Sequence, residues 1–88
     1  MKKYEIIFER SVDKLYRRLP KDVITRLDRA ILALADDPRP PGCKKLVGRH
    51  DYWRIRVGDW RVVYTVQDDA LLVLVIEIAP RGSVYRNL

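Results

Sequence analysis

The sequence predicts a small α+β domain in which an antiparallel-dominated sheet is covered on one face by a helical hairpin. Three observations predict this class. The chain has 88 residues, enough for one hydrophobic core, so we expect a single domain over residues 1–88. Two consecutive stretches repeat apolar residues at helical spacing, and their apolar stripes need a sheet to cover. The second half alternates apolar and polar residues around a Gly-Asp turn, as in a β-hairpin.

The first half of the chain is expected to form one short strand and two helices. Tyr4 to Phe8 predict the strand, and Ser11 is expected to cap the first helix. Pro20 interrupts the helical pattern, and a second helix is expected from Lys21 to about Asp36 because Pro38 stops it. The apolar stripe of the first helix comprises Val12, Leu15, Tyr16 and Leu19.

Three further strands are expected after a basic connection that runs from Lys44 to Arg49. They span Tyr52 to Val57, Trp60 to Gln67, and Leu71 to Ala79. The last is nearly all aliphatic, which is typical of a central strand covered on both faces. The predicted order is therefore β-α-α-β-β-β.

The hairpin formed by the first two of these strands carries the strongest indication of function. Its two-residue turn places Arg56 directly opposite Arg61, and the alternation of side chains puts Arg54 on the same face. The aromatic and aliphatic residues of the hairpin take the other face, toward the core. Like charges directly opposite each other destabilise a sheet, so this cluster favours an anionic ligand, with phosphate first.

Composition points to the same kind of partner. Eighteen Lys and Arg against twelve Asp and Glu give a net charge of +6, which favours nucleic acid, although a basic surface that only aids solubility is the alternative. The lone Cys43 has no partner for an internal disulfide, and we expect no metal and no cofactor. The chain begins without an apolar leader, and the apolar run from Ala70 to Ile76 is too short to cross a bilayer. We therefore expect a cytoplasmic protein with no membrane partner.

Three motifs together resemble the RelE/ParE toxin superfamily. They are Lys45-Leu46-x-Gly48, the hairpin from Asp51 to Tyr64, and Ile76-x-Ile78-x-x-Arg81-x-x-x-Tyr85. The resemblance covers nearly the whole chain and implies one RelE-like toxin domain of a type II toxin-antitoxin system. RelE-like members cut messenger RNA in the ribosomal A site, whereas ParE-like members share the fold but inhibit DNA gyrase.

The resemblance also implies which residues are catalytic. The matching positions are Arg54, Arg56, Arg61, Arg81 and Tyr85, and their presence favours the ribonuclease branch. In well-known RelE-type toxins the first two positions are lysines, and an arginine effectively cannot lose its proton. Either the general base lies elsewhere, or these two guanidinium groups only position and neutralise the phosphate. Arg81 would reach the leaving group or the phosphate, and Tyr85 would stack on a base or take part in proton transfer, stacking being the easier role for a tyrosine.

The roles of several other residues are less specific. Lys44, Lys45 and Arg49 are expected to contact RNA phosphates or to be merely solvated. His50 is expected to have a loop role. The face taken by Glu77 depends on the length of the second turn, so it pairs with an arginine, acts as a base, or has neither role.

The sequence thus predicts a metal-independent, ribosome-dependent endoribonuclease toxin, an mRNA interferase. Its expected partners are the ribosome, messenger RNA and a cognate antitoxin protein, with DNA contacted only indirectly through the antitoxin complex. The alternatives are a ParE-like DNA gyrase inhibitor and a catalytically inactive RelE-like binding module.

Overall fold

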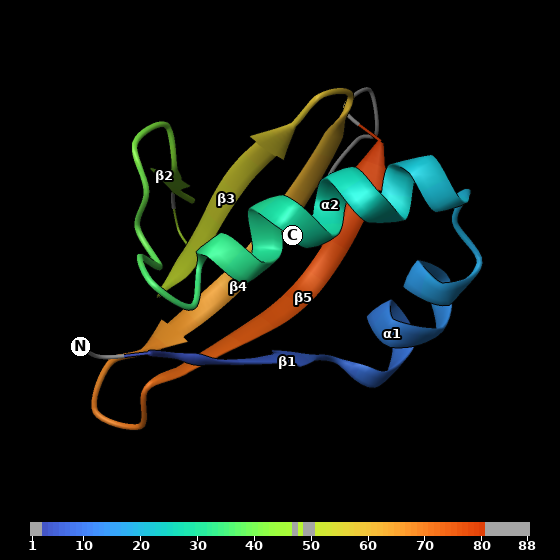
Figure 1. Cartoon of the computed structure of the whole chain (residues 1–88). Helices are drawn as coiled ribbons and strands as arrows, with labels where there is room; N and C mark the ends of the chain where they lie inside the picture. The colour runs from blue at the N-terminus through green and yellow to red at the C-terminus, as the bar shows by residue number, and fades with distance from the viewer. Residues whose placement is uncertain (1–2, 47, 49–50, 81–88) are drawn as a thin grey trace.

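The computed structural model describes residues 3–46, 48 and 51–80, and these form two helices and a five-stranded sheet (Figure 1). The elements in chain order are β1 (Glu5–Phe8), α1 (Arg10–Arg17), α2 (Lys21–Ala33), β2 (Lys44–Lys45), β3 (Tyr52–Val57), β4 (Trp60–Gln67) and β5 (Leu72–Pro80). The strand order is β1-β5-β4-β3-β2. Only β1 pairs in parallel, with β5, and the other neighbours are antiparallel. The predicted α+β class is confirmed, and the short strand β2 is added to it.

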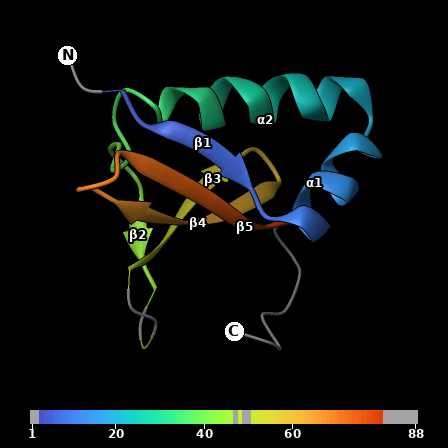
Figure 2. The ribbon, with the colours of Figure 1, turned by 90° about the horizontal axis from the view of Figure 1, so that it is seen from below.

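Figure 2 shows α2 along one face of the sheet and α1 beside the end of β1, and both helices contribute buried residues to the same core. Their buried residues pack with one face of the central strands into a single hydrophobic core. Leu27 in the helical layer and Val75 in the sheet layer are both 0% exposed. The fully buried members of this core are Leu27, Ile31, Leu34, Val62, Tyr64, Val73 and Val75. The opposite face of the sheet is not covered by the helices.

The helix boundaries differ from the sequence-based expectation at two places. Helix α1 begins at Arg10, and its N-cap is Glu9, whose carboxylate accepts the Ser11 backbone N–H at 2.7 Å. Ser11 is therefore inside the helix, and its prediction as the cap was wrong. Helix α2 ends at Ala33 instead of about Asp36, because the Leu34 N–H turns back to Ile31 in a tighter, three-residue hydrogen bond.

Strand β5 is internal, as its aliphatic composition predicted, because it lies between β1 and β4. The expectation that it is covered on both faces was wrong. Val73 and Val75 are fully buried toward the helices, but Leu74 on the opposite face is only half-buried. Its neighbour Ile7 on β1 is 40% exposed.

Candidate nucleic-acid interface

The three hairpin arginines lie together on the sheet face that the helices leave uncovered. Arg56 is directly opposite Arg61, and Arg54 is opposite Val63, as the alternation along the hairpin predicts. Val57 and Trp60, which flank the turn, instead pack against the core. We call Arg54, Arg56 and Arg61 the arginine face. Its existence confirms the geometric part of the sequence-based prediction.

Arg61 occupies the most enclosed position of the arginine face. Arg61 is only 8% exposed, and among the described residues it is the charged residue that is buried. Burial lowers the pKa of the Arg61 guanidinium, the neighbouring Arg54 and Arg56 lower it further, and the carboxylate of Glu77 opposes them. An arginine stays charged despite such a shift, so a concentrated positive potential is maintained at this point.

Glu77 reaches the arginine face because β4 and β5 change register. Val63 pairs with Glu77 but the next residue, Tyr64, pairs with Val75, so Ile76 has no cross-strand partner and forms a β-bulge. Strict alternation from the buried Val75 would have turned Glu77 toward the helices. The bulge is what the sequence reasoning missed, and the signal for it was the polar Glu77 out of phase within an aliphatic run. Burial raises the pKa of the Glu77 carboxyl, and Arg61 partly offsets this.

A pocket of about 320 Å³ adjoins the arginine face at the outer edge of β3. It is lined by Pro41, Gly42, Lys44, Arg54, Ile55 and Arg56. Strand β2 forms one side of it, because Lys44 pairs with Arg54. The Nε atom of Arg54 is buried and has no hydrogen-bond partner among the described atoms. A buried donor without an acceptor is costly to the stability of the fold.

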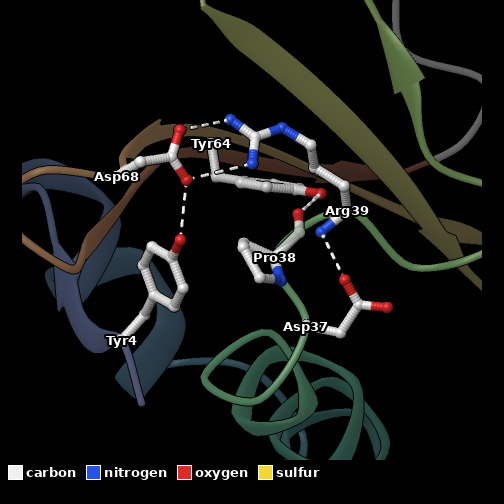
Figure 3. Close-up of polar contacts among 6 residues, drawn as sticks. All are labelled: Tyr4, Asp37, Pro38, Arg39, Tyr64 and Asp68. Atoms are coloured by element: carbon white, nitrogen blue, oxygen red, sulfur yellow. Dashed lines mark hydrogen bonds and ion pairs between the residues drawn. The ribbon is translucent and has the colours of Figure 1, made fainter. Parts of the chain in front are cut away.

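The loop that supplies Pro41 and Gly42 is held by hydrogen bonds to distant parts of the chain (Figure 3). The buried hydroxyl of Tyr64 donates to the Pro38 carbonyl at 2.7 Å. The Arg39 guanidinium donates to both carboxylate oxygens of Asp68, at 3.1 and 2.9 Å, and it also lies 5.1 Å from the centre of the Trp53 ring. The Tyr4 hydroxyl donates to the same carboxylate. These contacts fix the wall of the pocket relative to β3 and β4.

The two adjacent lysines of β2 lie in different surroundings. Lys44 lines the pocket beside Arg54 and Arg56. Lys45 instead has its Nζ atom 5.9 Å from the centre of the Trp53 ring, on the side of the sheet that carries the core. The structure therefore groups Lys44, and not Lys45, with the arginine face. Of the other predicted site residues, Arg49, Arg81 and Tyr85 lie outside the described residues, as does His50.

Over residues 3–46, 48 and 51–80, no group of three or more His, Cys, Asp or Glu side chains is placed to hold a metal ion. No helix in the same part of the chain is long and apolar enough to cross a membrane. Cys43 is a half-buried free thiol.

Comparison with known proteins gives the same fold and a consistent family. The model of the family described as "ParE toxin of type II toxin-antitoxin system, parDE" matches residues 5–85. A protein of Methanocaldococcus jannaschii named as a candidate toxin RelE1 is 27% identical over 88 residues, covering 97% of this chain and 98% of that protein.

Solved structures agree. A chain of the archaeal RelE–RelB complex from Pyrococcus horikoshii OT3 superposes with a TM-score of 0.81 at 29% identity, covering 93% of this chain and 99% of the other. The isolated E. coli RelE toxin gives 0.80 at 26% identity, with coverages of 93% and 88%.

The chain combines two helices with a sheet that carries a basic hairpin, and the toxin family model matches it over nearly its whole length. It is therefore a toxin of a type II toxin-antitoxin system. The chain belongs to the RelE/ParE toxin superfamily.

Proposed function

We propose that this toxin is a metal-independent, ribosome-dependent endoribonuclease that cuts messenger RNA in the A site. The observation that carries the proposal is the cross-strand pair of Arg56 and Arg61 on the face of the sheet that points away from the helices. Two guanidinium groups held side by side supply paired N–H donors to phosphate oxygens. Preorganised donors aimed at developing charge are the largest contribution in many enzymes, and removing one typically costs about 10²–10³ in rate.

The proposed reaction is an internal transesterification. The RNA 2′-oxygen attacks the adjacent phosphorus, the bond from phosphorus to the 5′-oxygen breaks, and the products are a 2′,3′-cyclic phosphate and a 5′-hydroxyl. Arg61 and Arg56 neutralise the extra charge on the phosphorane-like transition state, while Arg54 orients the 2′-hydroxyl or holds the next phosphate. The ribosome contributes by bending the RNA into an in-line geometry, which accounts for a site of modest intrinsic power.

Glu77 is the proposed acceptor of the 2′-hydroxyl proton. It is the only carboxylate among the residues of β3, β4 and β5, and the bulge turns it toward the arginines. Burial raises the pKa of this carboxyl, which brings it closer to the value that suits a general base near neutral pH. Positions 54 and 56 hold arginine instead of lysine, and neither arginine can accept a proton, so the general base has to be another group. A solvent water supplies the proton to the departing 5′-oxygen.

Arg81 and Tyr85 complete the proposed site from beyond β5. The strand ends at Pro80, which pairs with Trp60, the residue next to Arg61. Pro80, the residue before Arg81 in the sequence, therefore lies close to Arg61. We assign Arg81 to the phosphate or the leaving group, and Tyr85 to stacking on a base next to the cut.

The proposed antitoxin is an acidic protein that covers the arginine face. Relatives of this fold have been solved in complex with RelB, including the toxin of Pyrococcus horikoshii and that of E. coli. A net charge of +6 on the toxin favours a partner of opposite charge. Such a partner would block access of RNA by occupying the same guanidinium groups.

The experiment is to induce the wild-type chain in cells and map the 5′ ends of messenger RNA on stalled ribosomes. We expect cuts at codon-periodic positions within reading frames, and we expect them to vanish in Arg61→Ala and Glu77→Gln. The control is Arg29→Ala, which removes an exposed positive charge from α2 and should leave the cuts intact. Intact messages in cells that stop growing on induction of the wild type would overturn the proposal.

A gyrase inhibitor is the second candidate, because the matching family model is that of ParE. That function predicts DNA breaks and induction of DNA repair, with messages left whole. The same cultures therefore separate the two candidates if DNA integrity is measured beside the 5′ ends.

A further inference from the structure

The segment over residues 39–46 is attached to the rest of the fold by few contacts, and we call it the strap. None of its residues is buried, whereas Pro38 immediately before it is buried. Its strand pairing is confined to the two residues of β2 and to the Leu46 N–H, which donates to the Tyr52 carbonyl at 2.9 Å. Segments with little burial and few protected hydrogen bonds are those that open locally while the core stays folded.

The strap has a fixed base and a rigid middle. At the base, the Pro38 carbonyl accepts the buried Tyr64 hydroxyl. In the middle, the Cys43 N–H donates to the Pro40 carbonyl at 3.0 Å, and Gly42 has a φ of +92°, as in a type II turn with proline at its second position. Because such a turn keeps its shape, the strap moves as one piece about its base.

The contacts that close the strap lie at the surface and converge on Arg39 and Trp53. The Arg39 guanidinium reaches across to the carboxylate of Asp68 in the turn between β4 and β5, and these side chains are 38% and 56% exposed (Figure 3). Arg39 and Lys45 both lie near the Trp53 ring, at 5.1 and 5.9 Å from its centre. An exposed ion pair or cation–π contact shifts an equilibrium by up to about fivefold, so contacts of this kind close a segment reversibly.

We propose that the strap is a conformational switch and that the ion pair of Arg39 with Asp68 is its latch. In the closed state, Lys44 is paired with Arg54 at the edge of the sheet, which adds a cation beside the hairpin arginines. In the open state the strap rotates about Pro38 and its cations leave that edge. RNA therefore binds the closed state better, and a bound RNA holds the strap shut. Only this coupling to RNA rests on the proposed ribonuclease function.

The neighbouring aspartates of the turn provide a matched pair of variants. Asp68→Asn removes the carboxylate of the latch, whereas Asp69→Asn makes the same change in charge one residue further on. Both side chains belong to exposed residues, and thermal unfolding of each variant checks that the fold is kept. Arg39→Gln removes the other half of the latch.

Cys43 supplies the readout, because it is the single cysteine of the chain and lies half-buried in the strap, packed against the core. The full chain is treated with N-ethylmaleimide, and the rate is read from the mass of the toxin. We expect Asp68→Asn and Arg39→Gln to react about fivefold faster than the wild type, and Asp69→Asn to stay within about twofold. The double variant should react about as fast as Arg39→Gln, since both substitutions break one contact.

The urea dependence of the reaction separates local opening from unfolding of the whole domain. Opening of the strap exposes little surface, so the rate should hardly change with urea below the unfolding transition. Global unfolding as the route to Cys43 would instead give a rate that rises steeply from the lowest urea concentration. A merely structural loss of stability in Asp68→Asn would give that second pattern.

The coupling to RNA is tested on the same thiol. The toxin is mixed with ribosomes programmed with a non-cleavable 2′-O-methyl RNA, at about ten times the half-saturating concentration. The reaction of Cys43 in the wild type should then slow by about tenfold, because a ligand that binds one state suppresses the other by mass action. Lys44→Gln, measured at ten times its own half-saturating concentration, should lose most of this slowing, whereas steric cover by the RNA would slow both proteins equally.

Other results overturn the inference. Equal rates for Asp68→Asn and Asp69→Asn, or a reaction that follows global unfolding, would remove the switch. Equal slowing in the wild type and Lys44→Gln would remove its coupling to RNA. A wild-type toxin that neither binds programmed ribosomes nor cuts RNA, with the rates of the latch variants as expected, would overturn the proposed function and keep the switch.

Discussion

Replacing Arg56 with glutamine should make the protein more stable and less active at the same time. Arg56 and Arg61 are direct cross-strand neighbours, and they are not the hydrogen-bonded pair of the hairpin, so their Cα atoms are about 4.5 Å apart. With the two charges about 6 Å apart, Coulomb repulsion is about 0.7 kcal/mol in water and about 3 kcal/mol at an effective dielectric constant of 20.

The lower figure applies because the Arg56 side chain is exposed and screened. It agrees with the range of about 0.2–1 kcal/mol for like charges opposite each other on a sheet. Relief of this repulsion in Arg56→Gln should raise the free energy of unfolding by that amount. With a urea dependence of about 1–3 kcal/mol per molar, the midpoint should rise by about 0.1–0.5 M. The same substitution should lower cleavage by about tenfold to a hundredfold, because one charge-assisted contact to phosphate is lost.

Urea unfolding at low and high salt is the assay, with Arg29→Gln on α2 as the control for loss of one positive charge. The gain should shrink in 1 M salt, where the screening length falls to about 3 Å. A loss of stability in Arg56→Gln, or a gain that salt does not reduce, would refute the reasoning that this arginine pair is kept for an anion at a cost in stability.

Three further predictions concern single side chains. Burial raises the pKa of Glu77 above 4.5, so the stability this group contributes is present at low pH and lost as pH rises through the raised value. Glu77→Gln should therefore match the wild type near pH 4 and unfold at a higher temperature at pH 7, although cleavage falls. Tyr64→Phe leaves the buried Pro38 carbonyl without its donor and should cost about 1–3 kcal/mol in urea unfolding, whereas Tyr4→Phe, which removes an exposed hydrogen bond, should cost under about 0.5 kcal/mol. Leu27→Ala should cost about 2–5 kcal/mol, but Leu32→Ala, at a position 62% exposed, should cost under about 0.5 kcal/mol by the same measurement.

Local rules were sufficient to predict the hairpin and the arginine face. A two-residue turn with Gly58 at a φ of +59° fixes the register of both strands, and the period of two then assigns every side chain to a face. The two helices followed from apolar spacing and the prolines. Their ends were less predictable, because the N-cap at Glu9 and the tight last turn of α2 depend on details that spacing does not encode.

Features that depend on distant contacts could not be predicted. Strand β2 has two residues and exists only because β3 pairs with it. The pocket wall is placed by the bond from Tyr64 to Pro38, 26 residues apart, and the ion pair of Arg39 with Asp68, 29 residues apart. The bulge that turns Glu77 toward the arginines is a property of the pairing between β4 and β5 and is not visible in either strand alone.

The most direct test of the account is a single-turnover reaction of purified toxin with messenger RNA on programmed ribosomes, followed by analysis of the new ends. The account predicts a 2′,3′-cyclic phosphate and a 5′-hydroxyl without added metal, at a rate that falls at least about a hundredfold in Arg61→Ala, as expected when a donor to the transition-state charge is removed. Intact RNA with the wild-type toxin, or equal rates for wild type and Arg61→Ala, would contradict it.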